Sequence, residues 1–134
     1  MKDHIEEALA IFSDPNRSEL EREKALEMLK GFPSDEVIAA LIAALHDPDV
    51  GVRWSASEVL ALMGDSALKP LLLELASTRN DVNLRNSALH ILHTSRGENI
   101  QMRTAALQKA LKVTGPIAQI KSMEAANQLL IELS

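Results

Sequence analysis

The sequence predicts an all-α protein, an α-α superhelix (a helical solenoid) built from about four helix pairs. Three observations lead to this prediction. The chain repeats itself at a spacing of about 32 residues, each period contains two segments of helical length, and residues that break or cap helices separate those segments. Strands have no candidate, because no stretch sustains the alternation of apolar and polar residues that a half-buried strand shows.

The internal repeat is clearest when residues 41–63 are compared with the segment 32 residues further on. Moving the same stretch back by 31 residues aligns its Arg, Ala and Leu with a third segment, at Arg22, Ala25 and Leu29. The shared pattern Arg-x-x-Ala-x-x-x-Leu predicts three copies of one structural unit that stack on each other. The identical positions in the first comparison are Leu41/Leu73, Ala44/Ala76, Asp49/Asp81, Val50/Val82, Arg53/Arg85, Ser55/Ser87, Ala56/Ala88 and Leu60/Leu92.

Each period divides into a first and a second helix. In the second helix of the middle unit, one face at helical spacing carries Val52, Ala56, Val59, Leu60 and Met63. The expected helix pairs are 3–13 with 18–31, 35–46 with 50–63, 65–77 with 82–95, and 98–114 with 116–133. They form one domain over residues 1–134, with repeat units of about 1–33, 34–63, 64–96 and 97–134. The end units diverge from the pattern, as expected for caps with a polar outer face.

The expected turns contain residues that end or begin helices. Gly64 and Gly97 are typical of helix C-termini, where a residue without a side chain is favoured. Carboxylates that can accept the free backbone N–H groups of the next helix are Asp49, Asp65 and Asp81, and Ser18 with Glu21 forms the pattern of a capping box.

Composition and charge exclude several classes of protein. Cysteine is absent, which rules out disulfides and thiolate metal sites. The first residues are polar, unlike a signal peptide, and no apolar run reaches the roughly 18 residues of a membrane span. The net charge is −5, and no cluster of Lys and Arg is present that could follow a phosphate backbone. We therefore expect a cytoplasmic protein that binds neither membranes nor nucleic acid.

Two groups of residues could in principle carry chemistry. His90 and His93 are spaced to ligate a metal from one helix, but no further ligands complete a site, so we interpret them as surface histidines. The sequence contains no nucleophile elbow, phosphate-binding glycine loop or HExxH motif. We expect no enzyme activity, no metal and no cofactor. A group of acids that could suggest a carboxylate site instead spreads around one exposed helix: Glu19, Glu21, Glu23 and Glu27.

The stretch 40–56, Ala-Leu-Ile-Ala-Ala-Leu-His-Asp-Pro-Asp-Val-Gly-Val-Arg-Trp-Ser-Ala, resembles the HEAT-like repeat of phycobilisome lyase proteins. The shared features are the aspartate-rich turn, the Val-Arg pair that opens the second helix, and the small Ala that follows. The Gly64-Asp65 turn and Pro70 also match. The similarity is strong over 36–96, weaker over 1–35 and poor over 97–134.

The resemblance implies a ladder of polar contacts in which the turn aspartate meets the helix arginine. In this chain the ladder would join Asp49 with Arg53 and Asp81 with Arg85, and the spacing of four residues allows each pair to meet. Arg53 and Arg85 could alternatively recognise an anionic ligand. Their fixed place in the repeat favours the structural ladder.

Trp54 is the strongest candidate for a binding residue. Helical phase places it opposite the buried centre of its helix, and the resemblance places second helices on the concave side of the stack. An outward-facing Trp among polar groups has the composition of an interface hot spot, although Trp54 could instead cover a neighbouring repeat. The expected partner-binding residues are Trp54, Glu58, Asn86, Leu89, His90 and His93.

These observations predict a protein–protein interaction or scaffold module that binds a protein partner on the concave face of a helical stack. Two alternatives come from the resemblance alone. One is an accessory subunit of a bilin lyase or of a complex that handles phycobilisomes, although such proteins usually have more repeats. The other is a HEAT-like DNA glycosylase, which would need a basic groove that the net charge of −5 disfavours.

Overall fold

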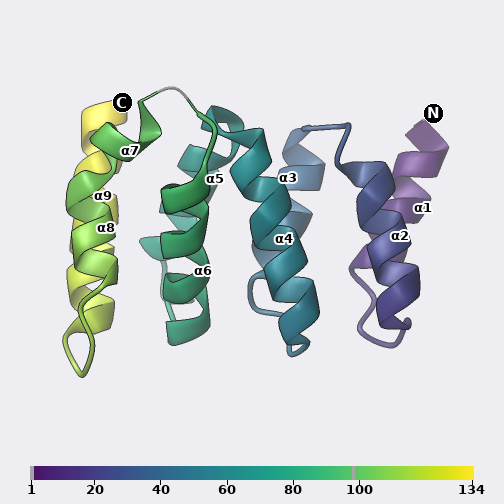
Figure 1. Ribbon diagram of the computed structural model, residues 1–134, viewed down its shortest axis with the longest axis horizontal. Helices are drawn as coiled ribbons and strands as arrows, with labels where there is room; N and C mark the ends of the chain where they lie inside the picture. Colours follow the sequence, from purple (N-terminus) through teal and green to yellow (C-terminus); the bar gives the residue numbers. More distant parts are fainter. Residues whose placement is uncertain (1, 98) are drawn as a thin grey trace.

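The computed structural model describes residues 2–97 and 99–134, and confirms the all-α fold class. Every regular element in these residues is a helix, and Figure 1 shows the helices standing side by side in a stack with the two termini at opposite ends. None of these helices is long and apolar enough to cross a bilayer. The helices are α1 (Lys2–Phe12), α2 (Glu19–Leu29), α3 (Asp35–Ala44), α4 (Val50–Met63), α5 (Asp65–Leu75), α6 (Val82–Thr94), α7 (Ile100–Arg103), α8 (Ala105–Leu111) and α9 (Ala118–Leu133).

The helices form two rows. The first helices of the repeat units, α1, α3 and α5, lie in one row, and the second helices, α2, α4 and α6, lie in the other (Figure 1). Within a unit the two helices pack against each other, and between units α4 packs against both α2 and α6. Each of these six helices begins and ends within two residues of the predicted bounds.

The last layer reverses the order of the two rows. The helix that comes first in the chain, α8, packs against α6 in the row of second helices, whereas the final helix, α9, packs against α5 in the row of first helices. Periodicity did not predict this reversal, because it shows which residues are apolar and not which neighbour covers them.

The predicted helix 98–114 is wrong as a single element. Its first residue, Glu98, lies outside the described residues, and the remainder divides at Thr104 into α7 and α8. The Gln101 side chain donates from α7 to the carbonyl oxygens of Leu92 and His93 at 2.7 and 2.6 Å. These carbonyls lie at the end of α6 and have no partner within that helix, so α7 crosses and caps it. The chain must then turn at Thr104 before α8 can run along α6.

The core is aliphatic, as the composition predicts. The face predicted for α4 is buried at Val52, Ala56, Val59 and Leu60, with Met63 half-buried beside them. Phe12 is a fully buried aromatic residue at the N-terminal end of this core. Leu and Ala side chains of facing helices allow close helix–helix packing, which a core of large aromatics would prevent.

Several predicted caps are confirmed. Ser18 and Glu21 form a capping box at the start of α2. Asp49 accepts from the backbone N–H of Gly51, and Asp81 accepts from that of Leu84, so these aspartates cap α4 and α6. The predicted cap at Asp65 is wrong, because α5 begins at Asp65 directly after Gly64, whose backbone has φ of 57°. The predicted cap at Gly97 is also wrong, since α6 ends at Thr94 and its C-cap residue is Ser95.

Candidate functional site

The sole tryptophan lies on the surface of the second-helix row. Trp54 is 56% exposed, and its ring lies against the imidazole of His90 with 4.5 Å between ring centroids and 35° between ring planes. His90 Nε2 is 3.0 Å from Glu58 Oε1. The three side chains therefore link α4 to α6 across the surface, and the indole is held in place while more than half of it stays open to a partner.

A pocket of about 200 Å³ adjoins this aromatic pair. It lies between α4 and α6, so the same two helices position both features. Its walls combine the indole and imidazole rings with guanidinium, amide and hydroxyl groups, which can form hydrogen bonds. The lining residues are Val50, Arg53, Trp54, Ser57, Asn83, Asn86, Ser87 and His90.

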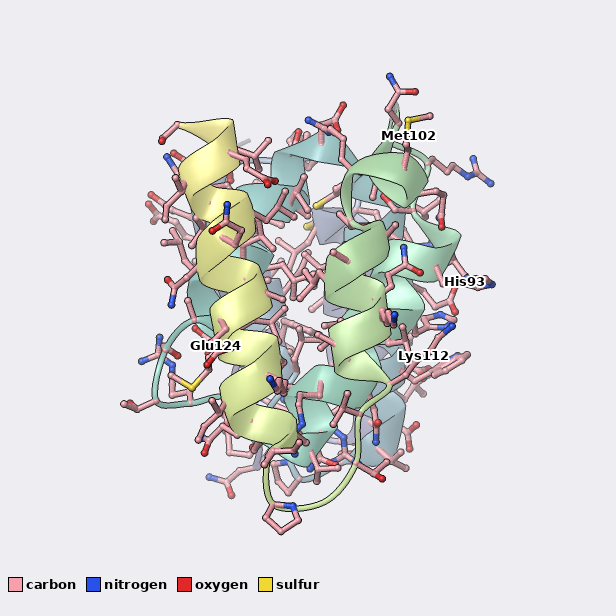
Figure 2. The ribbon with its side chains drawn as sticks, turned by 90° about the vertical axis from the view of Figure 1, so that its left-hand side faces the viewer. His93, Met102, Lys112 and Glu124 are labelled. Atoms are coloured by element: carbon pink, nitrogen blue, oxygen red, sulfur yellow. The ribbon has the colours of Figure 1, made fainter. Side chains whose placement is uncertain are left out.

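The structure brings Trp54, Glu58, Asn86 and His90 together, but not the other two predicted binding residues. Leu89 is half-buried and packs against the hydrophobic core, so the prediction that it faces outward is wrong. It lies on the flank of α6 that faces away from Trp54. Helical phase alone does not predict whether this flank is exposed or covered by another helix. His93 is exposed one turn beyond His90, on the same side of the molecule as Lys112 (Figure 2).

The predicted Asp–Arg ladder takes a different form. Arg53 Nη1 donates to the carbonyl oxygens of Asp47 and Pro48 at 2.7 and 3.3 Å, while the Asp49 carboxylate caps its own helix. Arg85 Nη1 likewise donates to the side-chain oxygen of Asn80 at 2.8 Å, and not to Asp81. The helix arginine thus binds the turn that precedes it, because the aspartate four residues earlier is already used as an N-cap.

Arg22 occupies the same repeat position and makes an ion pair that the sequence pattern did not predict. Its Nε donates to the Phe12 carbonyl at 2.9 Å, and its two Nη atoms bind the two carboxylate oxygens of Asp47. Burial opposes ionisation of Asp47, but the hydrogen bonds from Arg22 and from the Asp49 backbone outweigh it, and the pKa of Asp47 lies below its ordinary value. The alignment of Arg22 with Arg53 was the signal in the sequence, yet it did not identify an acid from the next unit.

A second polar cluster joins the α3–α4 turn to α5. Glu74 is only 8% exposed; it accepts two hydrogen bonds from Arg79 at 2.8 and 2.7 Å and lies 2.8 Å from His46 Nε2. His46 Nδ1 is also 3.5 Å from Asp81. The Arg79 hydrogen bonds, helped by His46 and opposed by burial, hold the pKa of Glu74 below its ordinary value. Both carboxylate oxygens of Glu74 already have partners, and the contact with His46 joins α5 to the preceding layer. We therefore interpret this cluster as a structural link between layers.

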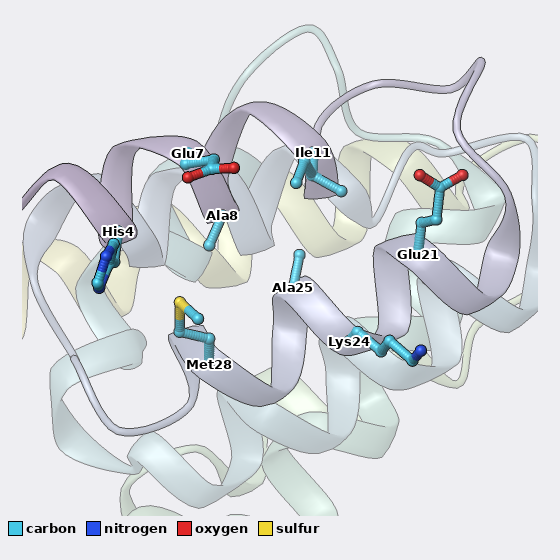
Figure 3. A pocket seen from close by; sticks show the side chains of 8 residues that line it. All are labelled: His4, Glu7, Ala8, Ile11, Glu21, Lys24, Ala25 and Met28. Atoms are coloured by element: carbon cyan, nitrogen blue, oxygen red, sulfur yellow. The ribbon is translucent and has the colours of Figure 1, made fainter.

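Another pocket, of about 310 Å³, lies between α1 and α2 at the N-terminal end (Figure 3). Ala8 and Ala25 face each other from the two helices, with Ile11 and Met28 beside them, and the charged residues lie around the edge. Small side chains open this space between the helices. It is lined by no Trp, Tyr or Phe side chain and lies apart from the Trp54 pocket.

Several side chains that were candidates for metal binding or catalysis already have partners within the protein. His90 is bound to Glu58 and Trp54. Glu21 belongs to the capping box and pairs with Arg17, and Glu27 pairs with Lys30. Among the side chains that the structure describes, those of residues 4–97 and 99–134, no three of His, Asp or Glu gather closely enough to hold a metal ion.

Comparison with known proteins identifies a family that most of the chain matches. A family model described as HEAT repeats matches residues 5–93, which is well over half of the 134 residues. The match covers the layers from α1 to α6 and ends before the reversed layer of α8 and α9. No curated protein and no solved structure matches the chain.

Proposed function

This chain belongs to the HEAT-repeat family, and on that premise we propose that it is a non-catalytic module whose protein partner binds the second-helix face around Trp54. HEAT repeats generally act as protein-interaction scaffolds, and their domains are typically non-catalytic. The partner-binding surface consists of Trp54, Glu58, Asn86 and His90 with the adjoining pocket, and it extends towards His93.

The observation that supports this proposal is the exposure of Trp54 in a fixed position. A large aromatic side chain that remains 56% exposed while stacked on His90 offers apolar area at little cost in side-chain entropy. Polar side chains with free hydrogen-bonding capacity lie around it, among them the exposed amide of Asn86. An aromatic centre within a polar rim is the usual composition of a binding hot spot.

The proposal is tested by measuring the affinity of a partner isolated with the native chain as bait. Trp54→Ala should raise the dissociation constant about 30-fold, since truncation of a hot-spot aromatic costs about 2 kcal/mol or more. Leu73→Ala is the matched control, because Leu73 is a large apolar residue that is 54% exposed on α5, in the other row of helices. It should leave the affinity unchanged.

Equal affinities of the wild-type protein and Trp54→Ala for the isolated partner would contradict the proposed surface. A partner that carries a bilin chromophore would favour the alternative of an accessory subunit in a complex that handles phycobilisomes. That outcome would identify the partner without changing the expected effect of Trp54→Ala.

A further inference from the structure

The outer face of α9 carries two widely exposed isoleucines, Ile120 at 56% and Ile131 at 67% exposure. They lie on the side of the helix opposite its buried residues, among them Ala118, Ser122 and Ala126. Glu124 and Asn127 lie between the isoleucines, and all four side chains are exposed. We call Ile120, Glu124, Asn127 and Ile131 the α9 seam; its isoleucines are about 16 Å apart along the helix.

The spacing of the α9 seam is typical of a helix face that packs lengthwise against a second helix. Successive seam residues are four, three and four positions apart, which is the spacing of the contact positions in a coiled coil. On one flank of the seam lie Met123 and Leu130, which are both half-buried. Packing against one more helix would therefore cover the exposed isoleucines and complete the burial of this flank.

We propose that the α9 seam binds the α9 seam of a second copy of this chain, with the two helices antiparallel and related by a twofold axis. The 4-3-4 spacing and the apolar–polar–polar–apolar order read the same from both ends, so the antiparallel pairing places Ile120 against Ile131 of the second copy and Glu124 against Asn127. On the flank it places Met123 against Leu130. Apolar residues meet apolar residues, and each carboxylate meets an amide that can donate to it.

The symmetry of the pattern points to a second copy and not to a foreign helix. A twofold interface requires one surface to be complementary to itself, with residue i contacting j and j contacting i. An unrelated partner would impose no such symmetry on the seam. A parallel pairing would bring the two copies of Glu124 together, and this repulsion between like charges selects the antiparallel arrangement.

The experiment is sedimentation equilibrium of the full chain at concentrations up to about 1 mM, where even a dimer with a dissociation constant of that order becomes populated. We expect the mass to rise from 14.6 kDa towards twice that value as concentration increases. Ile131→Glu should stay monomeric over the same range, with an unchanged helical circular dichroism spectrum because the residue is exposed. Leu62→Glu, which changes an exposed leucine on α4, should dimerise like the wild type.

Orientation is tested with cysteines, since the chain has none of its own. An equimolar mixture of Glu124→Cys and Asn127→Cys should form the mixed disulfide dimer faster than either variant dimerises alone. The proposal is overturned if the wild type remains a monomer, or if Ile131→Glu associates as the wild type does. Loss of dimers in Leu62→Glu, or faster disulfide formation by Glu124→Cys alone, would also overturn it.

Discussion

The guanidinium of Arg22, in α2, binds both carboxylate oxygens of Asp47, which lies 25 residues later in the turn between α3 and α4. The Arg22 residue is 4% exposed, so this ion pair is shielded from water. Its third contact, to the Phe12 carbonyl, fastens the turn between α1 and α2. One arginine thereby joins both helices of the first layer to the second layer.

Arg22→Ala should lower the free energy of unfolding by about 3–5 kcal/mol, because it leaves the carboxylate of Asp47, whose side chain is only 10% exposed, without its partner. Arg22→Lys should also be destabilising, since an ammonium cannot reproduce the paired hydrogen bonds of the guanidinium. Urea denaturation provides the measurement. Arg17→Ala is the control, and should cost under about 1 kcal/mol because Arg17 pairs with Asp14 and Glu21 at the surface. Similar midpoints for the three variants would contradict a structural role for the Arg22–Asp47 pair.

The lowered pKa of Glu74 predicts loss of stability in acid. Because this pKa is lower in the folded than in the unfolded chain, the unfolded chain binds the proton more readily. The contribution of Glu74 is complete above its ordinary pKa of 4.5 and disappears as the pH falls through its folded value. The Asp47 carboxylate, whose pKa is also lowered, acts in the same direction.

Urea midpoints measured between pH 7 and pH 3 should therefore decrease with falling pH, and Glu74→Gln should flatten the decrease. Glu132→Gln removes an exposed carboxylate near the end of α9 and serves as the matched control. If the two variants show the same pH dependence, Glu74 does not stabilise the fold through its ionised form.

The close approach of Gly97 to Ile100 and to the α4–α5 turn predicts that a side chain at position 97 would overpack this region. A Cβ atom on Gly97 would lie 2.0 Å from Ile100 Cδ1 and 3.0 Å from the Asp65 backbone nitrogen. Gly97→Ala should therefore destabilise the protein by about 1–3 kcal/mol, the usual cost of overpacking. Thermal or urea denaturation would measure this loss.

Gly31 provides the control for that substitution. A Cβ atom there meets nothing within 4 Å, and φ is not positive. Gly31→Ala should leave the protein unchanged or stabilise it by about 0.4–1 kcal/mol, through the reduced entropy of the unfolded chain. An equally harmless Gly97→Ala would contradict the close contact between Gly97 and the α4–α5 turn.

Trp54 should contribute little to folding. Trp54→Ala should cost only about 0.5–1.5 kcal/mol, chiefly through the loss of its contact with His90. Leu60→Ala in the same helix should cost about 2–5 kcal/mol, because Leu60 is 1% exposed and its removal leaves a cavity. The Trp54 fluorescence of the free protein should be red-shifted and readily quenched by acrylamide. A blue-shifted emission that resists acrylamide would show that the indole is buried.

The sequence by itself determined the helices of the first three layers, most of their caps, and the face that each helix buries. These features depend on residues that are close in the chain. Because a helix has 3.6 residues per turn, the spacing of two residues determines whether their side chains lie on the same face. The exposure of Trp54 followed from the same rule. So did its nearness to Asn86, since the 32-residue offset places equivalent positions on adjacent second helices.

Only the tertiary structure decided which neighbour covers each flank. Helical phase predicts that Leu89 points away from the centre of the core, but α6 packs against helices on two sides, and the packing leaves Leu89 half-buried. The acid bound by Arg22, the carboxylate of Glu74 beside His46 and the reversed order of α8 and α9 likewise depend on contacts between separate layers. Such contacts join residues that are far apart in the chain. The periodicity of a helix does not predict the distance in space between residues of different layers.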